Sequence, residues 1–320
     1  MKKKYMKILF IGNTRLGDAI LSTSILNYYS GSNLSITVVC SPLTENIYKN
    51  FSNVKDIIAV NKKKRGMHWL ETYSLLERVY WDLVIDLRNS ILSRLIRKKN
   101  ILRIGKVNPY KHRVESLCEL INTNEVISPN IPDNNTAEKE ALRIISEKNL
   151  VKPILAIAPV TNWQRKNWPL ENYILLINSL MKKSKDHNSF KSVIVLGSEK
   201  EKDQCNHLVD KINNINIKNL CGYCEISVIY ALLKHCRLFI GNDSGLMHLS
   251  AAANTYTLGL FGPSKEINYR PWGDRSYFLR TESNYEDLVN VKGYSRHHSS
   301  SLMKTLTVEK VLRKCSEILS

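Results

Sequence analysis

The stretch FIGNDSGLMHLSAAA, residues 239–253, passes from an apolar run through a short polar turn into an alanine-rich segment. The apolar run Leu238–Gly241, which begins one residue before the stretch, is typical of a buried strand, and Ser244–Ala253 has the composition of a helix. Ligands of α/β proteins bind where the strands of the sheet end and the helices begin. The stretch therefore predicts an α/β fold with chemically active side chains at a strand–helix junction.

Strands alternate with helices along the rest of the chain, an order typical of parallel sheets built from βαβ units. In the first half, the expected strands are Ile8–Gly12, Ser35–Cys40, Ile57–Val60 and Leu83–Leu87, and the expected helices are Asp18–Tyr29 and Trp69–Val79. In the second half, the expected strands are Ile154–Ala158, Ser192–Leu196, Leu238–Gly241 and Thr257–Phe261, and the expected helices are Leu170–Lys182, Val228–Lys234, Ser244–Ala253 and Thr307–Leu319. This pattern predicts two Rossmann-like α/β/α domains.

The boundary between the two domains is expected near residue 151. The segment SPNIPDNNT, residues 128–136, is rich in turn-forming residues, a polar helix follows at about Ala137–Lys148, and Lys152-Pro153 interrupts the chain again. We therefore expect an N-terminal domain of residues 1–150 and a C-terminal domain of residues 151–320. We leave open that the last helix packs back on the N-terminal domain.

The composition is that of a globular protein in a reducing compartment. Hydrophobic residues make up 43% of the 320 residues, enough for a sizeable core, and no apolar run of the roughly 18 residues that span a membrane occurs. The basic start MKKKYMKILF lacks the long apolar segment and the cleavage site of a secretion signal. Seven scattered cysteines, an odd number, favour free thiols in the cytoplasm.

The positive charge is concentrated in the first third of the chain. Of the formal net charge of +18, residues 1–113 carry +14, because they hold 21 Lys and Arg against 7 Asp and Glu. Runs of cations lie at Lys62–Arg65, Arg97–Lys99 and Lys111–Arg113. Such a field favours an anionic partner: a nucleic acid, an anionic membrane face or a phosphorylated substrate. For any one run, a solvated surface is the plainer alternative.

The first polar junction is GNTRLGDAI, residues 12–20. Gly12 and Gly17 allow a tight turn after the first strand, and Asp18 stands at the start of the next helix, where an acidic residue is often only a cap. The stretch has neither the Lys-Ser/Thr of a P-loop nor the G-x-G-x-x-G of a dinucleotide fold. An NAD-dependent enzyme is therefore disfavoured.

The second polar junction is APVTNWQRKNWPL, residues 158–170. Thr161, Asn162, Arg165 and Lys166 follow one expected strand and precede the next expected helix. Helix N-termini attract phosphate through free amide groups and the helix dipole. A lysine and a hydroxyl at this position would hold a diphosphate as a leaving group, whereas Trp168 is expected in the core.

The third polar junction is the stretch quoted first. Asp243 has an N-cap-like position, Ser244 and His248 lie four residues apart on one helix face, and Gly245 leaves room for a ligand near the backbone. We expect that face to point into a cleft between the domains, toward Lys166. A single buried histidine is more often a core residue than a ligand, so both roles stay open for His248.

No metal site is expected. Cys221 and Cys224 have the spacing of a zinc or redox motif, but no second cysteine pair or nearby histidine pair completes it. The pair is therefore interpreted as structural.

Three stretches, in this order, resemble glycosyltransferase family 9, the ADP-heptose:lipopolysaccharide heptosyltransferases. They are GNTRLGDAILSTSIL at 12–26, WQRKNWPLENY at 163–173, and NDSGLMHLSAAA at 242–253 with LFGPS at 260–264. A further stretch, YKHRVESLCEL at 110–120, looks like one that the family uses before its linker. Each motif alone is weak, but the ordered set is fairly specific and the resemblance covers nearly the whole chain.

The resemblance implies the GT-B architecture, in which an acceptor domain and a nucleotide-sugar domain face a central cleft. It also implies an inverting transfer without a metal, which agrees with the absence of an Asp-x-Asp motif from the sequence. By position, the catalytic residues would be Asp18, as the general base, and Lys166. The donor-binding residues would be Thr161, Asn162, Lys166, Asp243, Ser244, Gly245 and His248, and the acceptor-side residues would be Arg15, Gly17, Lys111 and Arg113.

The predicted function is transfer of a sugar, heptose from ADP-heptose, to the inner core of a lipopolysaccharide. The expected acceptor is an anionic lipid-linked saccharide at the inner face of the cytoplasmic membrane. The expected enzyme is a cytoplasmic, peripherally bound monomer with no cofactor and no specific nucleic-acid partner. Two alternatives stay open: transfer of another nucleotide-activated sugar in surface polysaccharide synthesis, and a basic non-enzymatic nucleic-acid-binding protein, for which the chain has no recognisable signature.

Overall fold

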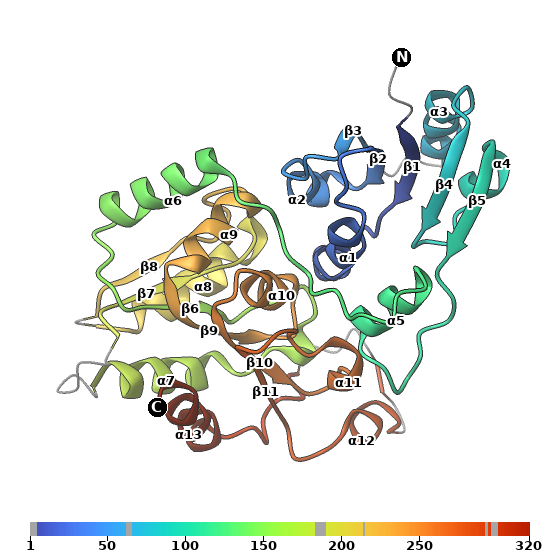
Figure 1. Cartoon of the computed structure of the whole chain (residues 1–320). Coiled ribbons are helices and arrows are strands. Elements are labelled where there is room, and N and C mark those ends of the chain that lie inside the picture. The colour runs from blue at the N-terminus through green and yellow to red at the C-terminus, as the bar shows by residue number, and fades with distance from the viewer. Residues whose placement is uncertain (1–4, 62–65, 183–189, 214, 292–293, 296–299) are drawn as a thin grey trace. The chain divides into compact units, whose positions relative to one another are not determined.

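The structure is a computed structural model that describes residues 5–61, 66–182, 190–213, 215–291, 294–295 and 300–320. It separates into two compact units, Met1–Asp133 and Asn134–Ser320. Each unit is built around one parallel sheet with helices packed on it (Figure 1). The predicted α/β class with two Rossmann-like units is therefore confirmed.

The first unit holds a five-stranded sheet in the order β3-β2-β1-β4-β5. Its strands are β1 (Met6–Ile11), β2 (Leu34–Cys40), β3 (Val54–Ala59), β4 (Trp81–Asp86) and β5 (Lys98–Arg103). Its helices are α1 (Leu16–Tyr28), α2 (Glu45–Tyr48), α3 (Met67–Leu76), α4 (Leu92–Leu95) and α5 (Arg113–Leu120), with a 3₁₀ turn η1 (Pro42–Thr44). The strand order reverses between β1 and β4, and sheets of this kind bind ligands at the carboxyl ends of the two strands at such a switch point.

The central strands of the first sheet are apolar on both faces because helices cover both. Residues 8–11 of β1 are completely buried. Leu76 at the end of α3 and Leu92 of α4 belong to the same buried cluster as Leu9 and Val84 of the sheet. Helices α3 and α4 therefore cover the same face of the sheet.

The edge strand β5 was not among the expected strands. Its first residues, Lys98 and Lys99, belong to the cationic run Arg97–Lys99, and charge of this kind suggests a solvated loop. The strand pairs with β4 alone, with Trp81 opposite Lys98. Edge strands commonly carry lysine because only one of their edges is paired. The cationic run Lys62–Arg65 lies outside the described residues.

The second unit holds a six-stranded parallel sheet in the order β11-β10-β9-β6-β7-β8. Its strands are β6 (Ile154–Ala158), β7 (Ser192–Val195), β8 (Ile217–Asn219), β9 (Cys236–Asn242), β10 (Tyr256–Phe261) and β11 (Ser276–Arg280). Its helices are α6 (Asn135–Glu147), α7 (Leu170–Lys182), α8 (Lys202–Asp210), α9 (Ile226–Lys234), α10 (Gly245–Ala252), α11 (Glu266–Tyr269), α12 (Tyr285–Val289) and α13 (Val308–Leu319), with 3₁₀ turns η3 (Gln164–Lys166) and η4 (Glu199–Glu201). The switch point of this sheet lies between β6 and β9.

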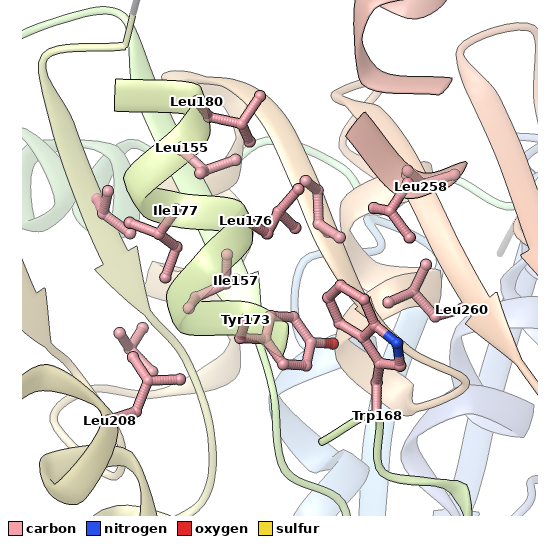
Figure 2. Close-up of a cluster of buried hydrophobic side chains, with 14 of the residues drawn as sticks. Leu155, Ile157, Trp168, Tyr173, Leu176, Ile177, Leu180, Leu208, Leu258 and Leu260 are labelled. Atoms are coloured by element: carbon pink, nitrogen blue, oxygen red, sulfur yellow. The ribbon is translucent and has the colours of Figure 1, made fainter. Parts of the chain in front are cut away.

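The core of the second unit lies between the sheet and α7 (Figure 2). Trp168 is fully buried there, as predicted, and its ring meets that of Tyr173 edge-on at a centroid distance of 4.9 Å. The Trp168 indole N–H donates to the carbonyl of Leu306 at 2.7 Å. The ring thus fills the core while its one polar atom is satisfied.

The last helix, α13, packs against α7 inside the second unit. Its buried face consists of Val311, Cys315 and Ile318, which join the same core cluster as α7. A contact of this helix with the first domain, left open from the sequence, stays a prediction.

Helix α6 belongs to the second unit, which corrects the expected domain boundary. The helix packs against α9, and His235 Nε2 lies 2.6 Å from the carboxylate of Glu138. The units therefore divide before α6, at Asp133 and Asn134, and not after it at residue 150. The sequence suggested otherwise because Lys152-Pro153 interrupts the chain inside the unit.

Among the described residues, no helix has both the length and the apolar character needed to cross a bilayer.

Candidate functional site

The strongest cluster of polar groups lies at the switch point of the second sheet. Strands β6 and β9 pair in parallel, with Ile157 opposite Ile240 and Ala158 opposite Gly241, so they end side by side. The loop that follows β6 carries Thr161 and Lys166, and the turn that follows β9 carries Asp243. The second and third predicted junctions therefore meet at one edge of one sheet.

Lys166 and Asp243 form an ion pair across this edge. The distance from Lys166 Nζ to Asp243 Oδ2 is 3.2 Å, and the two side chains are only 16% and 13% exposed. The Asp243 carboxylate holds the Lys166 ammonium group in place. An ammonium has three donors, so Lys166 can keep Asp243 and still donate to an anionic ligand.

Asn242, at the last position of β9, holds both ends of the Lys166 loop. It is fully buried, and its Nδ2 donates to the carbonyl of Pro159 at 2.7 Å. Its Oδ1 accepts from the backbone N–H of Trp168 at 2.9 Å and from the Tyr173 hydroxyl at 3.4 Å. Sequence reasoning missed this residue, although a polar amide ending an otherwise apolar strand was a signal that could have found it.

Thr161 and Asn162 take part in the loop in different ways. The Thr161 hydroxyl donates to Asn167 Oδ1 at 2.7 Å and accepts from the N–H of Trp163 at 3.3 Å. The Thr161 backbone N–H also donates to Asn167 Oδ1, at 3.0 Å. Thr161 thus orders the loop from inside, whereas the Asn162 side chain is exposed. The loop ends in η3, in which the N–H of Lys166 donates to the carbonyl of Trp163 at 3.1 Å.

The amino end of α10 follows the β9 turn directly and belongs to the same cluster. Ser244, rather than Asp243, is the N-cap residue, and its side chain makes no capping hydrogen bond. The Ser244 hydroxyl is buried with no hydrogen-bond partner among the described residues. Gly245 is the first residue of the helix, and His248 is 4% exposed. Uncapped amide groups at a helix start attract anions.

The loop after β10 lies next to the β9 turn. The N–H of Asp243 donates to the carbonyl of Leu260 at 3.2 Å, which ties the β9 turn to this neighbouring strand. The hydroxyl of Ser264 is buried and, like that of Ser244, has no partner within the described part of the chain. Arg280 Nη2 donates to the carbonyl of Gly262 at 3.0 Å and so braces the loop.

Arg165, which lies beside Lys166 in the sequence, has a structural role. It is 7% exposed, its guanidinium lies 4.7 Å from the ring of Tyr294, and it donates to the carbonyl of Ser295. Its own carbonyl accepts from the N–H of Leu302 at 2.8 Å. Of the two neighbouring cations, only Lys166 is paired with the β9 turn.

In the first unit, the residues of the first junction lie after β1. Arg15 is the exposed N-cap residue of α1, and Gly17 and Asp18 are the second and third helical residues. Asp18 is partly buried, and Tyr48 is fully buried. Burial, with a smaller contribution from repulsion by Asp18, raises the pKa of Tyr48 well above its ordinary value.

The switch point of the first sheet is completed by the end of β4. Asp86, opposite Ile11 of β1, is fully buried and accepts from the N–H groups of Arg88 at 2.9 Å and Ser90 at 2.7 Å. Asn13 Nδ2 is also buried there, with no hydrogen-bond partner within the described part of the chain. Neither Asn13 nor Asp86 was singled out from the sequence.

The remaining acceptor-side candidates, Lys111 and Arg113, flank the start of α5. Lys111 is exposed and forms an ion pair with Glu119, whereas Arg113 is 7% exposed. Between them, His112 Nδ1 accepts from the N–H of Val114 at 3.2 Å and caps the helix. The YKHRVESLCEL stretch is thus a helix start in which one cation points to solvent and the other is buried.

No group of three or more His, Cys, Asp and Glu side chains in the described part of the chain could hold a metal ion.

The comparisons with known proteins identify the family of this chain. The model of glycosyltransferase family 9 (heptosyltransferase) matches residues 73–297. Lipooligosaccharide heptosyltransferase 2 of Campylobacter jejuni is 26% identical, over 98% of both chains. A family 9 glycosyltransferase structure from Veillonella parvula matches with a TM-score of 0.84 and 19% identity over 100% of this chain and 98% of that one, and E. coli ADP-heptose lps heptosyltransferase II matches with a TM-score of 0.76 and 18% identity over 98% of both. The fold is the GT-B fold, and the chain belongs to glycosyltransferase family 9 and is a glycosyltransferase.

Proposed function

We propose that this enzyme transfers heptose from ADP-heptose to the inner core of a lipopolysaccharide. Membership of family 9 and similarity to a heptosyltransferase along 98% of the chain support this substrate class. We further propose that the transfer inverts the anomeric carbon and needs neither a metal ion nor another cofactor. The observation that carries the proposal is the Lys166–Asp243 pair, which lies at a sheet switch point beside an uncapped helix start.

In this proposal, the second unit binds the donor. Lys166 and the amide groups at the start of α10 hold the diphosphate and stabilise the charge that grows on it as it leaves. The Ser244 and Ser264 hydroxyls, buried with no partner among the described residues, have donors to offer to phosphate or sugar oxygens. Thr161 keeps the Lys166 loop in shape, and His248, which is buried in α10, belongs to the donor side.

The first unit would bind the acceptor and supply the base. Asp18 takes the proton of the acceptor hydroxyl while that oxygen bonds to the anomeric carbon from the side opposite the diphosphate. The bond from the anomeric carbon to the diphosphate oxygen breaks, and its electron pair leaves with ADP. This step needs Asp18 and Lys166 to face each other across a cleft between the units, and that arrangement is part of the proposal.

The acceptor is proposed to be an anionic, lipid-linked saccharide at the inner face of the cytoplasmic membrane. The excess of 14 positive charges in residues 1–113 supports an anionic acceptor and an anionic membrane surface. The enzyme would then act as a cytoplasmic monomer that binds the membrane peripherally.

The base is tested with Asp18→Asn. We expect turnover to fall by about 10²- to 10⁴-fold, because the amide cannot accept the proton, while the affinity for ADP is unchanged. The control is Asp82→Asn, which changes a carboxylate that accepts from the N–H of Lys7 near the start of β1. Turnover of Asp18→Asn near that of the control would remove Asp18 as the base.

The nucleotide is tested by calorimetric titration with ADP, UDP and GDP. We expect the lowest Kd for ADP. A lower Kd for UDP or GDP would point to another nucleotide-activated sugar and contradict ADP-heptose as the donor.

A further inference from the structure

One face of the first unit exposes large apolar side chains on two helices, α3 and α4, drawn beside β4 and β5 in Figure 1. On α3, Met67, Leu70 and Leu75 are 53%, 69% and 63% exposed. At the start and end of α4, Ile91 and Leu95 are 62% and 59% exposed. Large apolar side chains gathered on one surface are typical of sites that bind a partner.

These side chains lie on neighbouring helices of the first unit. Both helices pack on the same face of the sheet, because their buried residues join one core cluster. The C-terminal end of α3 is fastened to the segment after α4 by Arg97, whose Nε and Nη2 donate to the carbonyls of Glu77 at 3.3 Å and Arg78 at 3.1 Å. We call the surface formed by Met67, Leu70, Leu75, Ile91 and Leu95 the α3–α4 face.

The charges around the α3–α4 face are predominantly positive. The exposed charged residues between Met67 and Asn100 are one carboxylate, Glu71, and four cations. The cations are Arg78, Arg94, Arg97 and Lys99. Apolar side chains that project between cations fit an anionic bilayer surface, where the leucines enter the acyl boundary and the cations reach the lipid phosphates.

We propose that the α3–α4 face docks the enzyme on an anionic lipid bilayer. This inference deepens the proposed function and rests on it, since a lipid-linked acceptor lies in such a bilayer. The alternative occupants, a second copy of this chain or a soluble protein, would be expected to match the four cations with acidic groups.

The test is co-flotation of the full-length enzyme with vesicles of phosphatidylcholine alone or of equal parts phosphatidylcholine and phosphatidylglycerol. We expect wild-type enzyme to bind the mixed vesicles and not the neutral ones. In Leu70→Ser/Leu95→Ser, affinity for the mixed vesicles should fall at least about tenfold, because two large apolar side chains no longer leave water. The matched control is Leu142→Ser/Leu175→Ser, which changes leucines that are 48% and 56% exposed on the second unit, and it should bind like wild type.

A charge variant tests the electrostatic half of the inference. Each cation near an anionic surface contributes about fivefold to binding, so Arg94→Gln/Lys99→Gln should lower the affinity about 25-fold at low salt. Failure of wild type to bind the mixed vesicles, or wild-type binding by Leu70→Ser/Leu95→Ser, would overturn the docking surface. A wild-type dimer that this double variant dissociates, with vesicle binding unchanged, would overturn it in favour of a second copy.

A transfer assay distinguishes a failure of the docking surface from a failure of the proposed reaction. Transfer to a water-soluble, delipidated acceptor saccharide should be the same in wild type and Leu70→Ser/Leu95→Ser, because neither leucine lies at a strand end of the site. Absence of transfer in both, with vesicle binding as expected, would refute the proposed function and leave the docking surface intact. Selective loss of transfer in the double variant would count against a role limited to docking.

Discussion

The replacement Asn242→Ala should both loosen the Lys166 loop and destabilise the second unit. It removes the donor to the carbonyl of Pro159 and the acceptor of the N–H of Trp168, two groups that lie in the core. Leaving a buried polar group without a partner costs about 1–3 kcal/mol, so the two together should lower the free energy of unfolding by about 2–6 kcal/mol. The 3.4 Å contact with the Tyr173 hydroxyl is long and adds little.

Two measurements check this prediction. Thermal unfolding followed by tryptophan fluorescence should show a lower Tm, and titration with ADP should show a higher Kd, because the Lys166 loop is held at both ends by Asn242. Asn216→Ala is the matched control, since Asn216 Nδ2 donates to the carbonyl of Asn149 at 2.7 Å just before β8, far along the sheet from the loop. It should lower Tm modestly and leave the Kd for ADP unchanged.

The conservative variant Asn242→Asp changes the hydrogen bond at one end of the loop and keeps the one at the other end. Asn242→Asp keeps an acceptor for the N–H of Trp168 but brings a carboxylate oxygen against the carbonyl of Pro159, so it should be at least as destabilising as Asn242→Ala. A wild-type Tm and a wild-type Kd for ADP in Asn242→Ala would refute the reasoning that this side chain fastens the loop.

Three further predictions concern single sites. Lys166→Met should raise the Kd for ADP about 10- to 100-fold, because a hydrogen bond to a charged group contributes about 1.5–3 kcal/mol, and an unchanged Kd would contradict a phosphate role. Gly259→Ala should destabilise the enzyme by about 1–3 kcal/mol, because an added Cβ would lie 2.5 Å from Met247 Sδ and 3.2 Å from Pro271 Cδ, and a wild-type Tm would show that the core yields. Burial raises the pKa of Cys236 from 9.0 to about 12, so the folded chain keeps a proton that the unfolded chain releases. The free energy of unfolding should therefore fall as pH rises from about 9 to 12, by up to about 1.4 kcal/mol per pH unit. Chemical denaturation of Cys236→Ala should show a shallower fall, and an equal fall would exclude this thiol as the cause.

Much of the fold could be predicted because buried parallel strands are apolar along their whole length. Strand β6 and helix α7 agree with the sequence-based expectation residue for residue. Edge strands do not follow this rule, because one side of each is solvated. For that reason, β5 with its lysines and β11, whose residues are only partly buried, were missed.

The pairing of the donor-side junctions could also be predicted, because strand carboxyl ends meet at one edge of a parallel sheet. The role of each residue within the junction could not. Thr161 has the same sequence context as a phosphate ligand, yet its hydroxyl is used inside the loop. Asn242 looks like a continuation of its strand, and only the three-dimensional position of Pro159 and Trp168 reveals its function. Such roles depend on contacts between residues that are distant in sequence.

The tie between the Lys166 loop and the end of the chain has a consequence for biosynthesis. The loop is fastened by the N–H of Leu302 to Arg165 and by the indole of Trp168 to the carbonyl of Leu306, both near the C-terminus. The second unit therefore cannot fold completely until residues 302–306 have been synthesised, whereas the first unit, Met1–Asp133, precedes it in the nascent chain. A chain truncated before Leu302 should thus have a first unit that folds and a second unit that does not.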